Sequence, residues 1–300
     1  MAPHTVALQG HTGRIGGAAY QALLPGHAAG KFKLVIVHRP GSDVSKLPKD
    51  VEAREIDFEN ADEATITKAV QGINFYVSAV GFPGLASQAN LLKPFAATPG
   101  FVTYLIPVFG NPFWTQDYAT IEDKRIVNFL QMFNALTFGP TKLGIGRTSL
   151  QSGVFADYFT DPNLKYLDTD LAANRVLLPK GGENRGTILT SPEALGEAIA
   201  ELAARDPASI KDKDFYVYDY APTGNEIIQV LTKLHGKAPQ VKPETDEDYE
   251  KAMDTGVLPT MSPAIYRHCW GTGVWNWRGE RIGPKVNKDW EALAKTYYKK

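Results

Sequence analysis

Apolar runs alternate with amphipathic segments along the first half of the chain. The apolar runs predict six strands, over residues 5–8, 33–37, 51–56, 73–79, 101–106 and 142–148. The segments between them predict helices over residues 14–24, 61–71, 85–95 and 118–133, the second of them opened by a capping box of Asn60 and Glu63. Strands that alternate with helices are typical of βαβ units, which place helices on both faces of a parallel sheet. The pattern therefore predicts an α/β fold with a Rossmann-type, doubly wound parallel sheet.

The pattern is less regular after residue 150. Ser191-Pro192 predicts one helix start, and a capping box of Thr223 and Glu226 predicts another, with a strand over 215–218 between them. The polar segment 236–263 is expected to form loop and short helix over a substrate cleft.

The last part of the chain carries an aromatic cluster that is expected to pack into a core rather than form a binding surface. Its members are Tyr266, Trp270, Trp275, Trp277 and Trp290. We interpret residues 1–150 as a cofactor-binding domain, to which elements around 186–218 return. Residues 151–300 are then a smaller α/β substrate-binding region.

The motif Gly10-His11-Thr12-Gly13-Arg14-Ile15-Gly16 joins the first predicted strand to the first predicted helix. In this position the glycines allow a tight turn, a close approach of the backbone to a pyrophosphate, and close packing of helix on sheet. The helix N-terminus then offers N–H groups and a positive dipole end to phosphate. The motif predicts a dinucleotide site, and the Gly-x-x-Gly-x-x-Gly spacing is typical of short-chain dehydrogenase/reductases. The predicted contacts are Gly10, Thr12, Gly13, Arg14, Ile15 and Gly16.

The end of the second predicted strand indicates which dinucleotide is bound. An NAD-binding protein usually has Asp or Glu there, which accepts from the ribose 2′-hydroxyl. This chain has His38-Arg39-Pro40, and Arg39 would pair with the 2′-phosphate of NADPH. Arg14 is a second cation within reach, and Lys46 is a weaker third. Further contacts are expected from residues after the third and fourth strands, namely Asp57 at the adenine and Ser78, Ala79 and Val80 along the middle of the cofactor.

Composition excludes several alternatives. The formal net charge is −1, which gives no support to nucleic-acid or membrane binding. The single cysteine, Cys269, rules out a disulfide within the chain and is expected to be structural. No secretory signal and no apolar stretch of roughly 20 residues is visible, so we expect a cytoplasmic protein. We expect a small-molecule substrate as partner, and a monomer or a homodimer.

Four segments resemble one branch of the short-chain reductases. They are the opening segment 6–16, the strand end Val37-His38-Arg39-Pro40, the segment Ile106-Pro107-Val108-Phe109-Gly110, and residues 148–158 with Gly153 and Phe155. Together they resemble the NmrA-like and isoflavone reductase-like family of atypical short-chain dehydrogenase/reductases. In the third segment Val108 takes the place of a Ser-Glu pair of the family. The resemblance implies an NADPH-dependent reductase, with Phe155 in a segment that flanks the nicotinamide and Lys124 at about the family's distance for its active-site lysine.

The usual short-chain dehydrogenase chemistry is not encoded. No tyrosine is followed by a lysine four positions later, so the Tyr-x-x-x-Lys pair is missing. The resemblance instead makes Lys124 the single catalytic cation, and a partly buried lysine beside a dinucleotide can act as general acid or base. Tyr118, Tyr158 and His268 are weaker proton donors, each expected to be structural. No His/Cys/Asp cluster has metal-ligand spacing.

Three functions stay open. The first is a reductase that transfers hydride to a C=C, C=N or C=O bond of a small aromatic or heterocyclic, secondary-metabolite-like substrate. The second is an NmrA-like sensor that binds dinucleotide and reports its redox state without turnover; Lys124 and Arg39 argue against it. The third is a protein that retains the cofactor for non-redox chemistry, such as a cyclisation.

Overall fold

A computed structural model describes residues 3–81, 84–106, 109, 121–161, 166–275, 277–287 and 289–298. Its central feature is an eight-stranded parallel sheet in the order β12-β10-β6-β5-β4-β1-β2-β3. The strands are β1 Thr5–Gln9, β2 Lys33–His38, β3 Glu52–Glu55, β4 Phe75–Ser78, β5 Thr103–Leu105, β6 Gly146–Ser152, β10 Lys213–Val217 and β12 Glu280–Arg281. The chain runs outward from β1 to β3 and then returns to β4 on the other side of β1. The carboxyl ends of β1 and β4 therefore meet at the switch point of a doubly wound sheet, as predicted.

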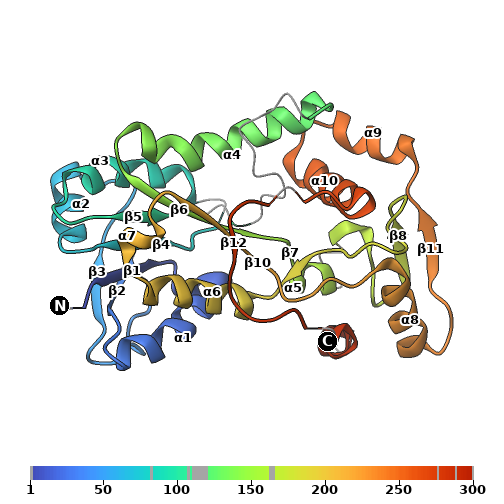
Figure 1. The fold of residues 1–300 in the computed structure, drawn as a ribbon, viewed down its shortest axis with the longest axis horizontal. Coiled ribbons are helices and arrows are strands. Elements are labelled where there is room, and N and C mark those ends of the chain that lie inside the picture. The colour runs from blue at the N-terminus through green and yellow to red at the C-terminus, as the bar shows by residue number, and fades with distance from the viewer. Residues whose placement is uncertain are drawn as a thin grey trace.

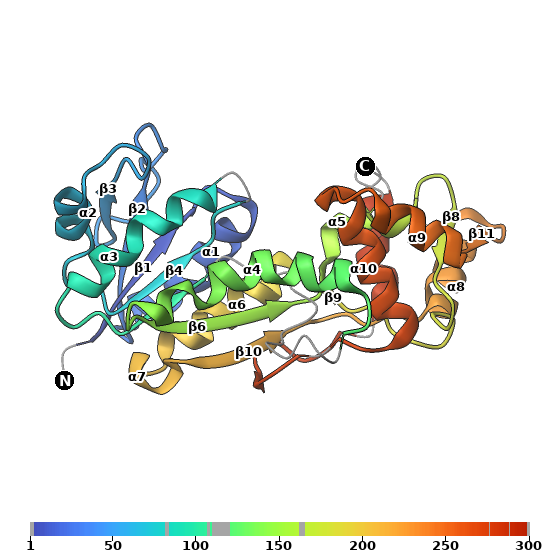
Figure 2. The same cartoon turned by 90° about the horizontal axis from the view of Figure 1, so that it is seen from above.

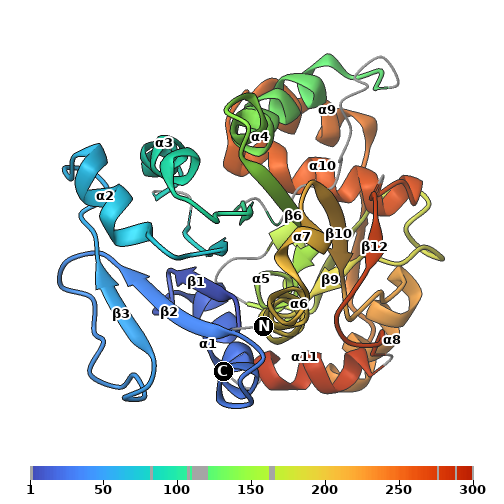
Figure 3. The same ribbon diagram turned by 60° about the vertical axis from the view of Figure 1, so that its left-hand side comes forward.

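Helices cover both faces of this sheet (Figure 3). On one face lie α1 Arg14–Ala28, α6 Pro192–Ala204 and the short α7 Pro207–Ile210, and α1 packs along α6. On the other lie α2 Glu63–Val70, the 3₁₀ turn η2 Ala86–Gln88 with α3 Ala89–Ala97, and α4 Lys124–Lys142. Strand β1 shows why both faces need cover, because Val6 and Leu8 enter one apolar cluster and Ala7 enters the other.

The remaining elements form a second, separate core beyond the carboxyl end of the sheet (Figures 1 and 2). They are β7 Val154–Phe155, α5 Ala156–Thr160, the 3₁₀ turn η4 Tyr166–Asp168, β8 Arg175–Leu178, β9 Leu189–Thr190, α8 Gly224–His235, β11 Gln240–Pro243, α9 Asp246–Asp254, α10 Leu258–Thr272 and α11 Trp290–Tyr298. Tyr266, Trp270, Trp275 and Trp290 are buried in this core, which confirms the packing role predicted for the aromatic cluster.

The helix starts at Ser191 and Thr223 are confirmed. The Ser191 hydroxyl accepts from the backbone of α6, and Thr223 and Glu226 form the predicted capping box. The cap of α2 is different from the prediction, because Asp62 caps it while the Asn60 amide donates to Asp57.

Three predicted boundaries are wrong. Helix α4 was predicted over 118–133 but begins at Lys124 and runs through Lys142. Residues 118–120 of the predicted helix lie outside the described residues. The strand expected from 142 therefore begins only at Gly146, after Gly144 has ended the helix with a φ of +72°. The segment 236–263 is not mostly loop but contains β11, α9 and the start of α10. A second capping box, of Thr245 and Asp248, opens α9 and was the local signal for it.

No helix among the described residues has the length and apolar character needed to cross a bilayer.

Candidate functional site

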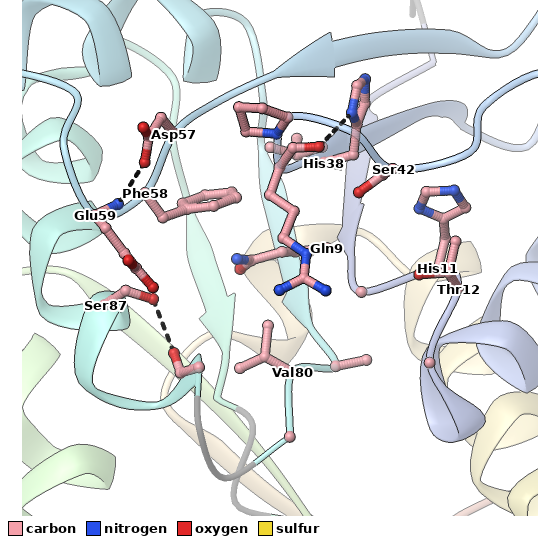
Figure 4. Close-up of a pocket in the computed structure, with 18 of the residues that line it drawn as sticks. Gln9, His11, Thr12, His38, Ser42, Asp57, Phe58, Glu59, Val80 and Ser87 are labelled. Carbon is pink, nitrogen blue, oxygen red and sulfur yellow. Dashed lines mark hydrogen bonds between the residues drawn. The ribbon is translucent and has the colours of Figure 1, made fainter.

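A cavity of about 570 Å³ opens at the carboxyl ends of β1, β2 and β4, at the switch point of the sheet. Figure 4 shows His11 and Thr12 on one side of it, Phe58, Glu59 and Ser87 on the opposite side, and Gln9 between them. The cavity brings together seven of the residues predicted to bind a dinucleotide: Gly10, Thr12, Gly13, Arg39, Asp57, Ala79 and Val80. Sequence analysis did not identify the contributions of His11, His38, Ser42, Phe58, Glu59, Asn60 and Ser87 to its lining.

Two glycines in the loop after β1 are needed for steric reasons. Gly10 has a φ of +92°, and a Cβ placed on it would lie 2.6 Å from the carbonyl oxygen of Ala79. A Cβ on Gly16 would lie only 1.9 Å from the carbonyl oxygen of Gly10. The first turn of α1 is therefore pressed directly onto the end of β1, which is the close packing that the motif predicts.

The N-terminus of α1 is left open toward a ligand. Its N-cap residue is Gly13, which has no side chain to cap the helix, and its first turn contains no acidic residue. The N–H of Gly13 donates to the carbonyl of Gly10 at 2.8 Å, which fixes the turn that precedes the helix. An uncapped helix N-terminus presents N–H groups and a partial positive charge, which together favour an anion.

Positive charge also lies at the end of β2. Arg39 lines the cavity, is exposed, and has no ion-pair partner among the described residues. His38 beside it is buried, and its Nδ1 lies 3.1 Å from the carbonyl oxygen of Arg39. Because no acidic side chain ends β2, a ribose 2′-phosphate would meet a free guanidinium there.

The opposite side of the cavity carries acidic side chains. Asp57 is used locally, because its carboxylate accepts from the Asn60 amide at 2.9 Å and from the backbone N–H groups of Glu59 and Asn60. These hydrogen bonds, the one from the Asn60 side chain first, lower the pKa of Asp57. Asp57 therefore shapes the turn that presents Phe58 and Glu59 to the cavity (Figure 4).

Ser78 is placed beneath the cavity rather than in its lining. It is fully buried, and its hydroxyl donates to the side-chain oxygen of Gln88 at 2.8 Å and lies 3.4 Å from the side-chain oxygen of Gln9. Tyr76 donates to the same oxygen of Gln9, which does line the cavity. Ser78 thus fixes the orientation of Gln9 through a buried hydrogen-bond network.

The two additional cations that the sequence suggested do not join Arg39. The Arg14 guanidinium pairs with Asp157 of α5 and lies over the rings of Phe155 and Tyr158. Lys46 is exposed and lines a different cavity of about 450 Å³, on the far side of His11 and Thr12. Of the other predicted contacts, Ile15 and Gly16 pack α1 against the sheet, and Phe155 lies half-buried at the end of β7.

Lys124 is the first residue of α4, and its side chain is exposed and does not line the cavity. The expectation of a partly buried amine is therefore wrong. The neighbouring residues anchor this helix end instead: Asp123 caps it, and Arg125 binds Asp123 and also the α9 carboxylates of Glu250 and Asp254. The Tyr249 hydroxyl donates to Asp123 at 3.1 Å.

The weaker candidates are placed as follows. Tyr118 lies outside the described residues. Tyr158 is exposed on α5, and His268 is exposed on α10 with its ring 5.6 Å from that of Tyr249. Cys269 is completely buried, and burial raises the pKa of its thiol well above the ordinary value. A neutral thiol without solvent contact fits the structural role and not that of a nucleophile.

The chain resembles known proteins in its structure but not detectably in its sequence. No family model matches the chain, and no curated protein matches it in sequence. Solved structures do match over almost its full length. Leucoanthocyanidin reductase from Vitis vinifera, in its complex with NADPH, has a TM-score of 0.70 at 17% identity, covering 99% of this chain and 100% of its own.

Two further structures agree with it. An isoflavone reductase has a TM-score of 0.72 at 19% identity, covering 98% of this chain and 99% of its own. The triphenylmethane reductase of Citrobacter sp., complexed with NADP(H), has a TM-score of 0.65 at 17% identity, again covering 98% and 99%. At this level of identity the shared property is the fold. This chain therefore has, along its whole length, the Rossmann-type fold of the isoflavone reductase, leucoanthocyanidin reductase and triphenylmethane reductase structures.

Proposed function

We propose that this chain is an NADPH-dependent reductase of the isoflavone reductase-like, atypical short-chain type. The observation that carries the proposal is that the uncapped N-terminus of α1 and Arg39, which has no ion-pair partner in the described part of the chain, face one cavity at the switch point of the sheet. This arrangement provides one anion site for a pyrophosphate and a second for a 2′-phosphate. The neighbours solved with NADPH or NADP(H) support the same cofactor.

Different residues of the cavity would contact different parts of this cofactor. Gly10, Thr12 and Gly13 would lie against the pyrophosphate, Arg39 would pair with the 2′-phosphate, and Phe58 with the turn fixed by Asp57 would lie at the adenine. In the usual binding mode of a doubly wound sheet, the adenosine half would lie over β2 and β3, and the nicotinamide half would lie beyond β4 toward β5 and β6. When bound, NADPH supplies the hydride, and the protein orients it and excludes water.

We propose further that the substrate is a small aromatic or heterocyclic molecule reduced at a C=C, C=N or C=O bond. The neighbours are reductases of leucoanthocyanidins, isoflavones and triphenylmethane dyes, all of them aromatic. The second core beyond the carboxyl end of the sheet supports the assignment of residues 151–300 to substrate binding and of 1–150, with the elements around 186–218, to the cofactor.

We propose Lys124 as the catalytic cation of this reductase. This role is supported by the position of this lysine in the sequence, whereas its amine is exposed and outside the cavity lining. The alternative is a dinucleotide sensor without turnover, which needs the cofactor cavity but no catalytic cation.

The test is oxidation of NADPH by the purified protein with a panel of aromatic enones, cyclic imines, aryl ketones and triphenylmethane dyes. We expect loss of NADPH absorbance with at least one member and identification of the reduced product by mass spectrometry. The same panel with Gly16→Ala, which blocks the phosphate loop, is the control for contaminating reductases. NADPH binding without oxidation by any member would contradict the reductase and support the sensor.

A further inference from the structure

Arg14 lies inside the phosphate loop, yet its side chain leaves the loop in a direction different from that of the cavity. Its guanidinium carbon lies 4.5 Å from the centre of the Phe155 ring and 4.1 Å from the centre of the Tyr158 ring. One of its nitrogens pairs with Asp157. A planar guanidinium suits this environment, because it can lie on aromatic faces and bind a carboxylate at the same time.

The three partners form one small surface, which we call the α5 wall and define as Phe155, Asp157 and Tyr158. The rings of Phe155 and Tyr158 meet edge to face with centroids 5.5 Å apart, and the Asp157 carboxylate accepts from the backbone N–H of Tyr158 at 3.1 Å. The Asp157 side chain is only 15% exposed and that of Arg14 is 32% exposed. The contact is therefore partly shielded from water, and its energy is less reduced by solvent than that of a typical surface pair.

The α5 wall also continues into the second core. The Tyr158 ring lies 6.1 Å from that of Tyr166, and the Tyr166 hydroxyl shares a hydrogen bond of 2.7 Å with Ser262 of α10. Arg14 is thus the first member of a series of contacts that begins in the phosphate loop and ends on α10, a helix of the proposed substrate region.

The sheet order indicates which half of the cofactor this contact would influence. The α5 wall follows β6 and β7, whereas Arg39 follows β2 on the opposite side of the switch point. A dinucleotide that places its adenosine half over β2 and β3 extends its other half toward β6. The contacts of Arg14 therefore lie on the side where the nicotinamide half is expected, although the sequence suggested a contact with the 2′-phosphate.

We propose that Arg14 is a positioning residue: by binding Asp157 and lying on Phe155 and Tyr158, it holds the α5 wall against the phosphate loop and so shapes the nicotinamide half of the site. This inference rests on the proposed NADPH function. Its consequence is specific, since loss of Arg14 should weaken binding of the nicotinamide half and leave binding of the adenosine half intact.

Two ligands separate these halves. Titrations of 2′,5′-ADP, which contains the 2′-phosphate but no nicotinamide, and of NADPH are measured by calorimetry for the wild type and for Arg14→Ala. We expect 2′,5′-ADP affinity to change less than about 2-fold and NADPH affinity to fall about 5- to 10-fold, as for loss of partly shielded cation–π and ion-pair contacts. The fluorescence of bound NADPH should move toward that of the free cofactor, because its nicotinamide ring is held less firmly.

Three variants test the cause. Asp157→Asn should reproduce the NADPH-specific loss, and the double variant should be no worse than Arg14→Ala, because both remove one contact. Arg14→Lys should restore part of the affinity, since it keeps the charge for Asp157 but not the flat face for the rings. Arg205→Ala, which removes an arginine paired with Glu201 of α6 and Glu280 of β12, is the matched control and should change the affinity for neither ligand.

The outcomes are distinct. Equal losses of affinity for 2′,5′-ADP and NADPH in Arg14→Ala would overturn the inference and indicate that Arg14 contacts the 2′-phosphate. Unchanged affinity for both ligands would also overturn the inference. Failure of the wild type to bind either ligand would overturn the proposed function itself, and the inference with it. If Arg14→Ala does not fold, as judged by circular dichroism and thermal unfolding, the same comparison is made with Asp157→Asn, whose result then decides.

Discussion

Two helix N-termini in this molecule are built in opposite ways. Helix α1 begins after Gly13, with no capping side chain and no acid in its first turn. Helix α4 begins after Asp123, whose carboxylate caps the helix and binds Arg125, while Arg125 reaches two carboxylates of α9. The backbone N–H groups of α1 are open toward a cavity lined by the Arg39 guanidinium, whereas the start of α4 is anchored by the protein's own side chains.

This difference distinguishes a helix N-terminus that can bind a ligand from one that is already satisfied by the protein. A helix N-terminus whose backbone N–H groups have no capping side chain, and which lies next to a pocket, can bind an anionic ligand there. A helix end that is already capped and ion-paired is explained by stability alone. By this criterion the open N-terminus of α1 supports the proposed cofactor site, whereas the capped N-terminus of α4 gives no such support to a catalytic role of Lys124.

The largest expected effect is at the packing that opens α1. Gly16→Ala places a Cβ 1.9 Å from the Gly10 carbonyl oxygen, so the loop must move, and we expect loss of NADPH binding and about 1–3 kcal/mol of stability. Gly17→Ala is the matched control, because its Cβ would meet only the His11 carbonyl at an ordinary 3.6 Å. The control should bind NADPH normally and be slightly more stable. Equal behaviour of the two variants, in urea unfolding and NADPH titration, would remove the steric argument.

The second largest effect is expected from the loss of Arg39, the cation at the end of β2. We expect Arg39→Ala to weaken NADPH binding about 10- to 100-fold, as for loss of a charge-assisted contact with phosphate, and to leave NADH binding unchanged. Lys46→Ala is the control, since Lys46 lines a different cavity and should change either affinity little. An equal loss of affinity for NADPH and NADH in Arg39→Ala would show that Arg39 does not bind the 2′-phosphate specifically.

A smaller effect is expected at the capped end of α4. Asp123→Ala should cost about 1–2 kcal/mol of unfolding free energy and leave NADPH binding intact, because it removes a cap and an ion pair. Hydrogen bonding to Arg125, first of all, lowers the pKa of Asp123 in the folded protein below its unfolded value. Its contribution is thus complete above the unfolded pKa and is lost as the pH falls through the folded pKa.

Urea unfolding of the wild type and Asp123→Ala at neutral pH and near the acid limit of the folded state measures this dependence. The difference between the two proteins should shrink at the lower pH. The exposed neighbour Glu122 provides the control, because Glu122→Ala should differ little from the wild type at either pH. A stability difference that does not change with pH would assign the cost to something other than the Asp123 carboxylate.

The smallest expected effect on binding is that of Lys124→Ala. Because its side chain is exposed and outside the cavity, unfolding free energy should change by less than about 0.5 kcal/mol and NADPH affinity by less than about 2-fold. If Lys124 is the catalytic cation of the proposal, turnover of an accepted substrate is nevertheless lost in this variant. Retained turnover would remove Lys124 from the mechanism and keep the reductase.

The parts of this account that sequence could predict are those set by local rules. The glycine loop at Gly10–Gly16, the strands around it and the caps at Ser191 and Thr223 follow from backbone sterics and short-range hydrogen bonds. The end of α4 differs from the prediction: Lys142 and Leu143 were placed in a strand over 142–148, whereas Lys142 ends the helix and Leu143 is an exposed residue directly after it.

The site residues that sequence missed or misplaced depend on long-range contacts. The direction of the Arg14 side chain is decided by Asp157, 143 positions later in the chain, and no local pattern contains that information. The same holds for Ser87 of η2 and Phe58 of the turn after β3, which line one cavity although they lie far apart in the sequence. Lys124 was placed from a family distance, whereas its environment is fixed by its neighbours' contacts with α9.

The most direct test of the central claim is the affinity of the wild-type protein for NADPH and for NADH, measured by fluorescence titration at one ionic strength. The claim that α1 and Arg39 together hold a 2′-phosphorylated dinucleotide predicts binding of NADPH at least about 10-fold tighter than that of NADH. Equal affinities, or no binding of NADPH, would contradict it.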